Sequence, residues 1–126
     1  MKICFVITRG DEFGGAQTHV RYLATEMHNT GNDVTVVTGT LGLFTDQLLA
    51  DGIPVLCIRH IKRPINILID ALAVLSLYRH FRSIKYDVIT AHSSKAGVIT
   101  AIAASCCGKP FVFTAHSWPF LQGLSR

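Results

Sequence analysis

The sequence predicts an α/β protein whose parallel sheet has the strand order 3-2-1-4-5 and carries helices on both faces. Short apolar runs rich in β-branched residues recur along the chain, and segments of helical length alternate with them. Continuous apolar runs are typical of strands that are buried on both faces. Because each intervening helix returns the chain across the sheet, such alternation produces parallel strands. The predicted class is therefore a Rossmann-like domain.

The strands and helices can be placed by their apolar patterns. The predicted strands are residues 2–8, 33–38, 54–58, 87–91 and 111–115. The predicted helices are residues 16–29, 45–50, 65–84 and 95–107. In the first helix, Val20, Leu23, Ala24 and Met27 fall on one face at helical spacing, and Gly31 ends the segment.

Composition limits the possible functions. The chain has 126 residues, of which 49% are hydrophobic and 16% charged, so it can form one domain with a substantial core. Its net charge of +4 suits contact with phosphates or an anionic membrane. No basic run is longer than Lys62-Arg63 and no aromatic residues interleave with one, which excludes a nucleic-acid-binding face.

Cysteine usage and hydropathy indicate the compartment. Cys4 and Cys57 fall inside predicted strands, while Cys106 and Cys107 are adjacent, a poor geometry for a mutual disulfide and the wrong spacing for zinc. The longest apolar stretch, residues 65–78, has 14 residues and is too short to span a bilayer. Since the amino terminus also carries no cleavage-type signal, we expect a cytoplasmic protein.

A glycine-rich loop, residues 10–17, follows the first strand. In a parallel sheet, ligands bind beyond the carboxyl ends of the strands at the point where the strand order reverses. Gly14 and Gly15 would let the backbone of a helix start approach a phosphate or a sugar hydroxyl. A tight turn without a ligand explains the loop about equally well. Because Ala16-Gln17 replace the Lys-Ser/Thr pair of a P-loop, that motif is excluded.

Two Ala-His-Ser tripeptides end the fourth and fifth predicted strands. The first places His92, Ser94 and Lys95 at the same sheet edge, and the second places His116 there. A serine that caps the following helix is an equally good interpretation of the first tripeptide. A single histidine at a strand end is more often a hydrogen-bonded structural residue than a catalytic one.

Three segments together resemble the retaining glycosyltransferases of family 4, which have the two-domain GT-B fold. They are residues 14–20 (GGAQTHV), residues 87–97 (DVITAHSSKAG) and residues 113–116 (FTAH), in the order in which the family has them. The resemblance implies that Gly14 and Gly15 lie near the donor phosphates and the acceptor, and that His116 reaches the transferred sugar. It makes His92, Ser94 and Lys95 further cleft candidates. No cofactor and no metal are expected.

The resemblance also implies a domain organisation. Residues 1–126 would be the amino-terminal, acceptor-side domain, incomplete at its end, without the domain that binds the nucleotide-sugar donor. The expected partners are a nucleotide-sugar donor held by a missing or separate carboxyl-terminal domain and a glycan or lipid-linked acceptor, in cell-surface polysaccharide synthesis. The isolated chain would be inactive or one part of a split enzyme. A non-enzymatic partner-binding module and a truncated product without function are the alternatives.

Basic residues flank the long apolar helix. Arg59, His60 and the Lys62-Arg63 pair precede it, which suggests peripheral contact with acidic lipid head groups at the inner face of the membrane. A second cluster at residues 79–85 is better explained by cationic side chains that complement the helix dipole.

Overall fold

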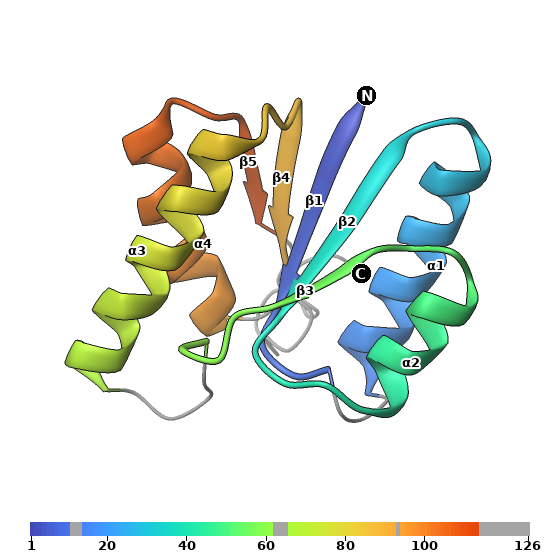
Figure 1. The fold of residues 1–126 in the computed structure, drawn as a ribbon, viewed down its shortest axis with the longest axis horizontal. Coiled ribbons are helices and arrows are strands. Elements are labelled where there is room, and N and C mark those ends of the chain that lie inside the picture. The colour runs from blue at the N-terminus through green and yellow to red at the C-terminus, as the bar shows by residue number, and fades with distance from the viewer. Residues whose placement is uncertain (11–13, 62–65, 93, 114–126) are drawn as a thin grey trace, which may run out of the picture.

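The computed structural model describes residues 1–10, 14–61, 66–92 and 94–113. These residues form three layers, with one sheet between two layers of helices (Figure 1). Helices α1 and α2 cover one face of the sheet, and α3 and α4 cover the other.

The elements lie close to their predicted positions. The strands are β1 (Lys2–Ile7), β2 (Asp33–Thr38), β3 (Val55–Cys57), β4 (Val88–Ala91) and β5 (Phe111–Phe113). The helices are α1 (Gly15–Asn29), α2 (Leu43–Ala50), α3 (Ile67–Ser83) and α4 (Ser94–Cys107).

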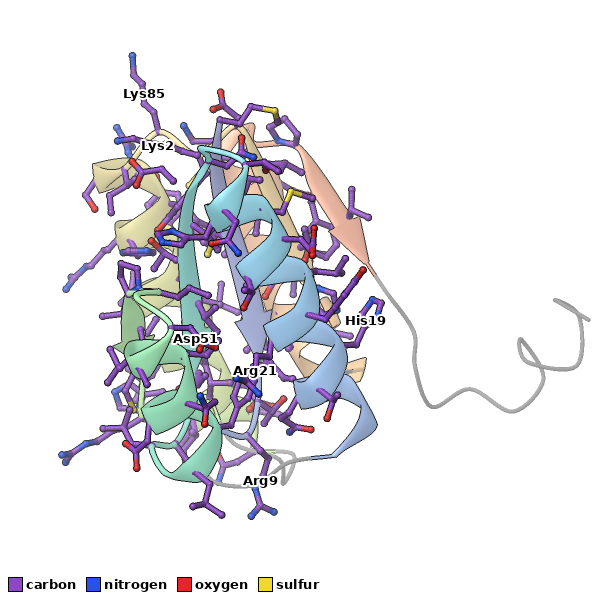
Figure 2. All side chains as sticks on the ribbon, turned by 90° about the vertical axis from the view of Figure 1, so that its right-hand side faces the viewer. Lys2, Arg9, His19, Arg21, Asp51 and Lys85 are labelled. Carbon is purple, nitrogen blue, oxygen red and sulfur yellow. The ribbon has the colours of Figure 1, made fainter. Side chains whose placement is uncertain are left out.

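The sheet has the predicted topology. Its strand order is β3-β2-β1-β4-β5, and each neighbouring pair is parallel. The order reverses between β1 and β4, where Val6 of β1 pairs with both Val37 and Ala91. Figure 2 shows the two ends of the molecule, with Lys2 and Lys85 at one end and Arg9, just beyond the carboxyl end of β1, at the other.

The central strand β1 is buried on both faces. Ile3, Phe5 and Ile7 belong to the core beneath α1 and α2, whereas Cys4 and Val6 belong to the core beneath α3 and α4. This arrangement explains why residues 3–7 are continuously apolar instead of alternating with polar residues. Burial raises the pKa of the Cys4 thiol to about 12, so this cysteine is a small core residue and not a reactive one.

The ends of two helices differ from the predicted bounds for local reasons. Helix α3 begins at Ile67, because the side chain of Asn66 accepts hydrogen bonds from the amides of Leu68 and Ile69 at 3.1 and 3.2 Å. Helix α2 begins two residues earlier than predicted, at Leu43. There the hydroxyl of Thr45 accepts a hydrogen bond from the Gly42 amide at 2.9 Å.

Gly39 is the tightest point of the loop that follows β2. Its amide donates to the carbonyl of Thr8 at 3.0 Å. A Cβ atom at this position would lie 1.8 Å from the carbonyl oxygen of Ile61 and 2.8 Å from that of Thr8. The ends of β1 and β2 and the loop after β3 therefore converge on a glycine because no side chain fits between their backbones.

We expect Gly39→Ala to lower the free energy of unfolding by about 3 kcal/mol, since the added methyl group overlaps fixed backbone atoms. Gly15→Ala is the matched control, because a Cβ there meets nothing within 4 Å, and its effect should stay within about 0.5 kcal/mol. Urea unfolding followed by circular dichroism measures both. Equal stability of the two variants would contradict the packing at Gly39.

Candidate functional site

The loop after β1 is anchored to the loop after β2. The amide of Gly10 donates to the hydroxyl of Thr40 at 2.9 Å, and the carbonyl of Gly10 accepts from the amide of Thr45 at 3.1 Å. A Cβ atom on Gly10 would lie 2.3 Å from the carbonyl oxygen of Thr40, so this approach also requires glycine. Residues 11–13 of the predicted glycine loop lie outside the described residues.

The side chain of Gln17 fixes the start of α1. It is only 7% exposed, accepts a hydrogen bond from the Gly14 amide at 3.1 Å and donates one to the Arg9 carbonyl at 3.1 Å. One side chain therefore links the two described ends of the loop, Arg9 and Gly14. This leaves Gly14 and Gly15 exposed at the helix start with their backbone orientation fixed.

The start of α1 presents the positive end of a helix. No acidic side chain lies in the first turn of α1, and open space surrounds the position where Gly15 would carry a Cβ. The amide groups of a first helical turn have no partners within the helix and form its positive end. A phosphate or a sugar hydroxyl can therefore approach the backbone at Gly14 and Gly15.

His92 lies at the predicted edge, but its side chain is buried. The residue directly follows β4, and its amide donates to the carbonyl of Val6 at 3.0 Å. The imidazole is 2% exposed, lies 2.5 Å from the hydroxyl of Thr90 through Nε2, and has its centroid 5.5 Å from that of Phe5. His92 therefore packs beneath the sheet edge against Phe5 and Thr90, and its ring does not face solvent.

The remaining predicted site residues are only partly described. Ser94 and Lys95 form the start of α4, which places their backbone at the same sheet edge as Gly14 and Gly15. Their roles in a cleft stay predictions. His116 lies outside the described residues, so its predicted role as the residue that reaches the transferred sugar also stays a prediction.

Some residues at this edge were not among the sequence-predicted candidates. Gln17 and His19 belong to the GGAQTHV segment, but no pattern in that segment separates them from other polar helix residues. Leu41 and Leu43, in the loop after β2 and at the start of α2, are exposed large apolar side chains at the same edge. Their exposure could not be inferred, because short apolar segments are usually buried.

The part of the chain that the structure describes contains no candidate metal site and no candidate membrane-spanning helix. These residues contain no group of three or more His, Cys, Asp or Glu side chains that could hold a metal ion. None of their helices is both long enough and apolar enough to cross a membrane.

The fold and this edge agree with the family suggested by the sequence motifs. Residues 13–126 match the family model Glycosyltransferase Family 4, and the chain belongs to that family. Its parallel sheet reverses strand order between β1 and β4, which is where open α/β sheets of this kind bind ligands.

The chain is similar to several named proteins in sequence or in structure. It is 34% identical over 93 residues to the Escherichia coli UDP-Gal:alpha-D-GlcNAc-diphosphoundecaprenol alpha-1,3-galactosyltransferase, covering 70% of this chain and 23% of that protein. The structure resembles HepE from Anabaena in complex with UDP-glucose, with a TM-score of 0.65 and 28% identity, covering 90% of this chain and 28% of HepE. MurG from Acinetobacter baumannii shares the fold, with a TM-score of 0.73 and 17% identity, covering 97% of this chain and 38% of MurG. The chain thus spans between about a quarter and two fifths of these relatives.

We expect Gln17→Ala to destabilise the protein by about 1–3 kcal/mol, because it leaves the Gly14 amide and the Arg9 carbonyl without their shared partner. Gln47→Ala is the matched control. The Gln47 side chain makes a long hydrogen bond of 3.5 Å to Asp51 on the helix surface, so its removal should lower the free energy of unfolding by less than about 0.5 kcal/mol. Urea unfolding compares the two variants. If Gln17→Ala lowers the free energy of unfolding no more than Gln47→Ala does, the Gln17 side chain does not stabilise the glycine loop as described.

Proposed function

We propose that this chain is the acceptor-side part of a glycosyltransferase. The enzyme would transfer a sugar from a nucleotide-sugar donor to a glycan or lipid-linked acceptor in cell-surface polysaccharide synthesis. The observation that carries the proposal is the exposed start of α1, where Gln17 holds Gly14 and Gly15 beside the carboxyl ends of β1 and β4 in a family 4 chain.

Two relatives support a uridine diphosphate sugar as the donor. HepE was solved with UDP and with UDP-glucose, and the Escherichia coli relative is named for UDP-Gal. That relative is also named for an acceptor that joins a sugar to a lipid through a diphosphate. We infer an acceptor of this kind here. The first-turn amides of α1, beginning with that of Gly15, would bind a phosphate or sugar oxygen, because the Gly14 amide already donates to Gln17. His116 would contact the transferred sugar, as the family resemblance implies.

The second wall of the cleft would come from another domain. Sugar transfer requires donor and acceptor to be held together while charge on the departing diphosphate is stabilised. The described residues supply a helix start and polar side chains for one wall. We propose that a donor-binding domain, on the same or on a separate polypeptide, supplies the other, and that residues 1–126 alone do not catalyse transfer.

We expect no galactose transfer from UDP-galactose by residues 1–126 alone. Turnover should appear when the donor-binding part of the Escherichia coli relative is fused after residue 126. In that fusion, His116→Ala should reduce the rate roughly 100-fold, the loss that follows removal of one charge-stabilising contact. A radiolabelled transfer assay measures these rates, and circular dichroism confirms that the variant is folded.

Robust turnover by residues 1–126 alone would overturn the proposed division between two domains. A folded fusion that neither binds UDP-galactose nor transfers sugar would favour the partner-binding module instead.

We further propose that the protein binds membranes peripherally through the outer face of α3 and α4, at the inner face of the membrane. Both helices leave large apolar side chains exposed, among them Ile67 at 83% and Leu68 at 78%. Leu72 and Leu75 of α3 and Val98 and Ile102 of α4 are exposed as well. Exposed apolar groups in such number mark contact with another molecule or with a lipid surface.

Charge next to this face favours an anionic lipid surface. Arg59 is exposed after β3, and the Lys62-Arg63 pair follows it in the sequence, outside the described residues. The second basic cluster has a local role instead. The guanidinium of Arg82 donates to the hydroxyl of Tyr78 at 3.0 Å and lies 5.7 Å from the centre of that ring.

We expect the protein to float with phosphatidylglycerol vesicles at low salt and to be released at high salt, because salt screens the attraction of Arg59 and its neighbours. The double variant Ile67→Glu/Leu68→Glu should lose more than about tenfold in binding, since it replaces two exposed apolar side chains that would be buried in the lipid surface. Leu49→Glu is the matched control. Leu49 is also exposed, at 57%, but lies on α2 in the opposite helical layer. If the double variant and Leu49→Glu bind vesicles equally well, or if the wild type does not bind at low salt, this face is not a membrane-binding surface.

A further inference from the structure

A pair of histidines lies at the reversal of strand order. The centroids of His19 and His92 are 6.0 Å apart and their rings are inclined at 51°. His92 is buried, whereas His19 is exposed. One imidazole therefore lies inside the sheet edge and the other stands above it, on the surface.

The surroundings of His92 hold its ring in place. Phe5 lies against it from β1, and the hydroxyl of Thr90 pairs with its Nε2 atom at 2.5 Å. A phenylalanine would occupy the same space next to Phe5 without the loss of hydration that a buried imidazole incurs. The polar ring at this position bonds Thr90 and lies beside His19, so it does more than fill the space next to Phe5.

The position of His19 follows from α1 and from the sheet register. His19 lies four residues after Gly15, so the two share one face of the helix and are one turn apart. On the sheet side, His92 follows Ala91, which pairs with Phe113, the last residue of β5. Figure 2 shows His19 on the side of α1 that is turned toward the β5 edge of the sheet. His19 therefore stands between the exposed helix start and the carboxyl ends of β4 and β5.

We propose that His19 contacts a sugar hydroxyl of the bound substrate and that His92 is a positioning residue that fixes the orientation of the His19 ring. The inference rests on the proposed function. A neutral imidazole offers one N–H donor and one nitrogen acceptor, which suits a hydroxyl group that both donates and accepts. The phosphate contacts stay with the backbone at Gly14 and Gly15, one turn away. His19 thus adds a contact that depends on the orientation of the sugar.

The substrate hydroxyl could belong to the acceptor or to the donor, and the experiment uses one probe for each. The acceptor probe is α-N-acetylglucosaminyl diphosphate esterified to a short alkyl chain, and the donor probe is UDP-galactose. Nuclear magnetic resonance follows the ring signals of the six histidines of residues 1–126, in the fusion with the donor-binding part of the Escherichia coli relative, during titration with each probe. Signals are assigned with single variants, and dissociation constants are taken from the same titrations.

The acceptor probe should shift the His19 ring signals saturably, and His19→Gln should weaken its binding about five- to tenfold, the effect of one lost hydrogen bond. His92→Phe should weaken binding about threefold and leave the thermal midpoint unchanged, because the packing against Phe5 is kept. His92→Gln, which can still bond Thr90, should restore part of the affinity. His28→Gln is the matched control on the last turn of the same helix and should bind as the wild type does.

The possible results separate the proposed His19 contact from the proposed function and from a purely structural role of His92. If the acceptor probe binds but His19→Gln has the wild-type dissociation constant, the His19 contact is wrong and the proposed function stands. If only UDP-galactose shifts the His19 signals, the contact is to the donor sugar. If neither probe shifts any histidine signal, the proposed function fails, and the inference fails with it. A loss of thermal stability in His92→Phe that fully accounts for its weaker binding would make His92 structural only.

Discussion

Burial of β1 on both faces is the constraint on which the rest of the structure depends. Alternate side chains of this strand enter two separate cores, so neither face of the sheet centre can be left to solvent. The chain satisfies this requirement with α1 and α2 on one side and α3 and α4 on the other. Because the first two crossovers run to one side of β1 and the next leads to its other side, the strand order must reverse beside β1. The reversal creates the edge at which the loops after β1 and β4 diverge.

The chemistry of the site follows from that edge. Diverging loops leave the start of α1 accessible, and Gln17 converts an adjacent pair of glycines into a backbone of defined orientation. Thr40 in the loop after β2 and Thr45 in α2 bind Gly10 from the other side. The site is therefore built from backbone groups held by side chains in neighbouring loops. Such a framework suits recognition of phosphates and sugars, whose oxygens need oriented donors more than they need a single reactive residue.

The surfaces of the two helical layers combine polar contacts with exposed apolar side chains. Arg21 of α1 bonds Asp51 at 2.9 Å, and this arginine lowers the pKa of the Asp51 carboxyl, so α1 and α2 join through a polar contact at their surface. Large apolar side chains are exposed in both layers, among them Leu43 and Leu49 on α2 and Ile67 and Leu68 on α3. Exposed apolar groups of this kind are typical of a surface that meets lipid or another molecule.

The sequence by itself determined the fold, because its information is local and periodic. Apolar runs such as residues 3–7, glycines at the junctions and the alternation of elements fixed the strand order and most boundaries to within two residues. It also selected Gly14, Gly15 and His92 as residues of one sheet edge. It could not decide which polar groups face a ligand, because burial depends on contacts between residues far apart in the chain. Only the tertiary structure buried His92 between Phe5 and Thr90, brought His19 over it, and made Gln17 the link between Arg9 and Gly14. Likewise, only the tertiary structure decided which apolar residues of α3 are covered: Ala73, Leu77 and Phe81 are buried, whereas Ile67 and Leu68 remain exposed.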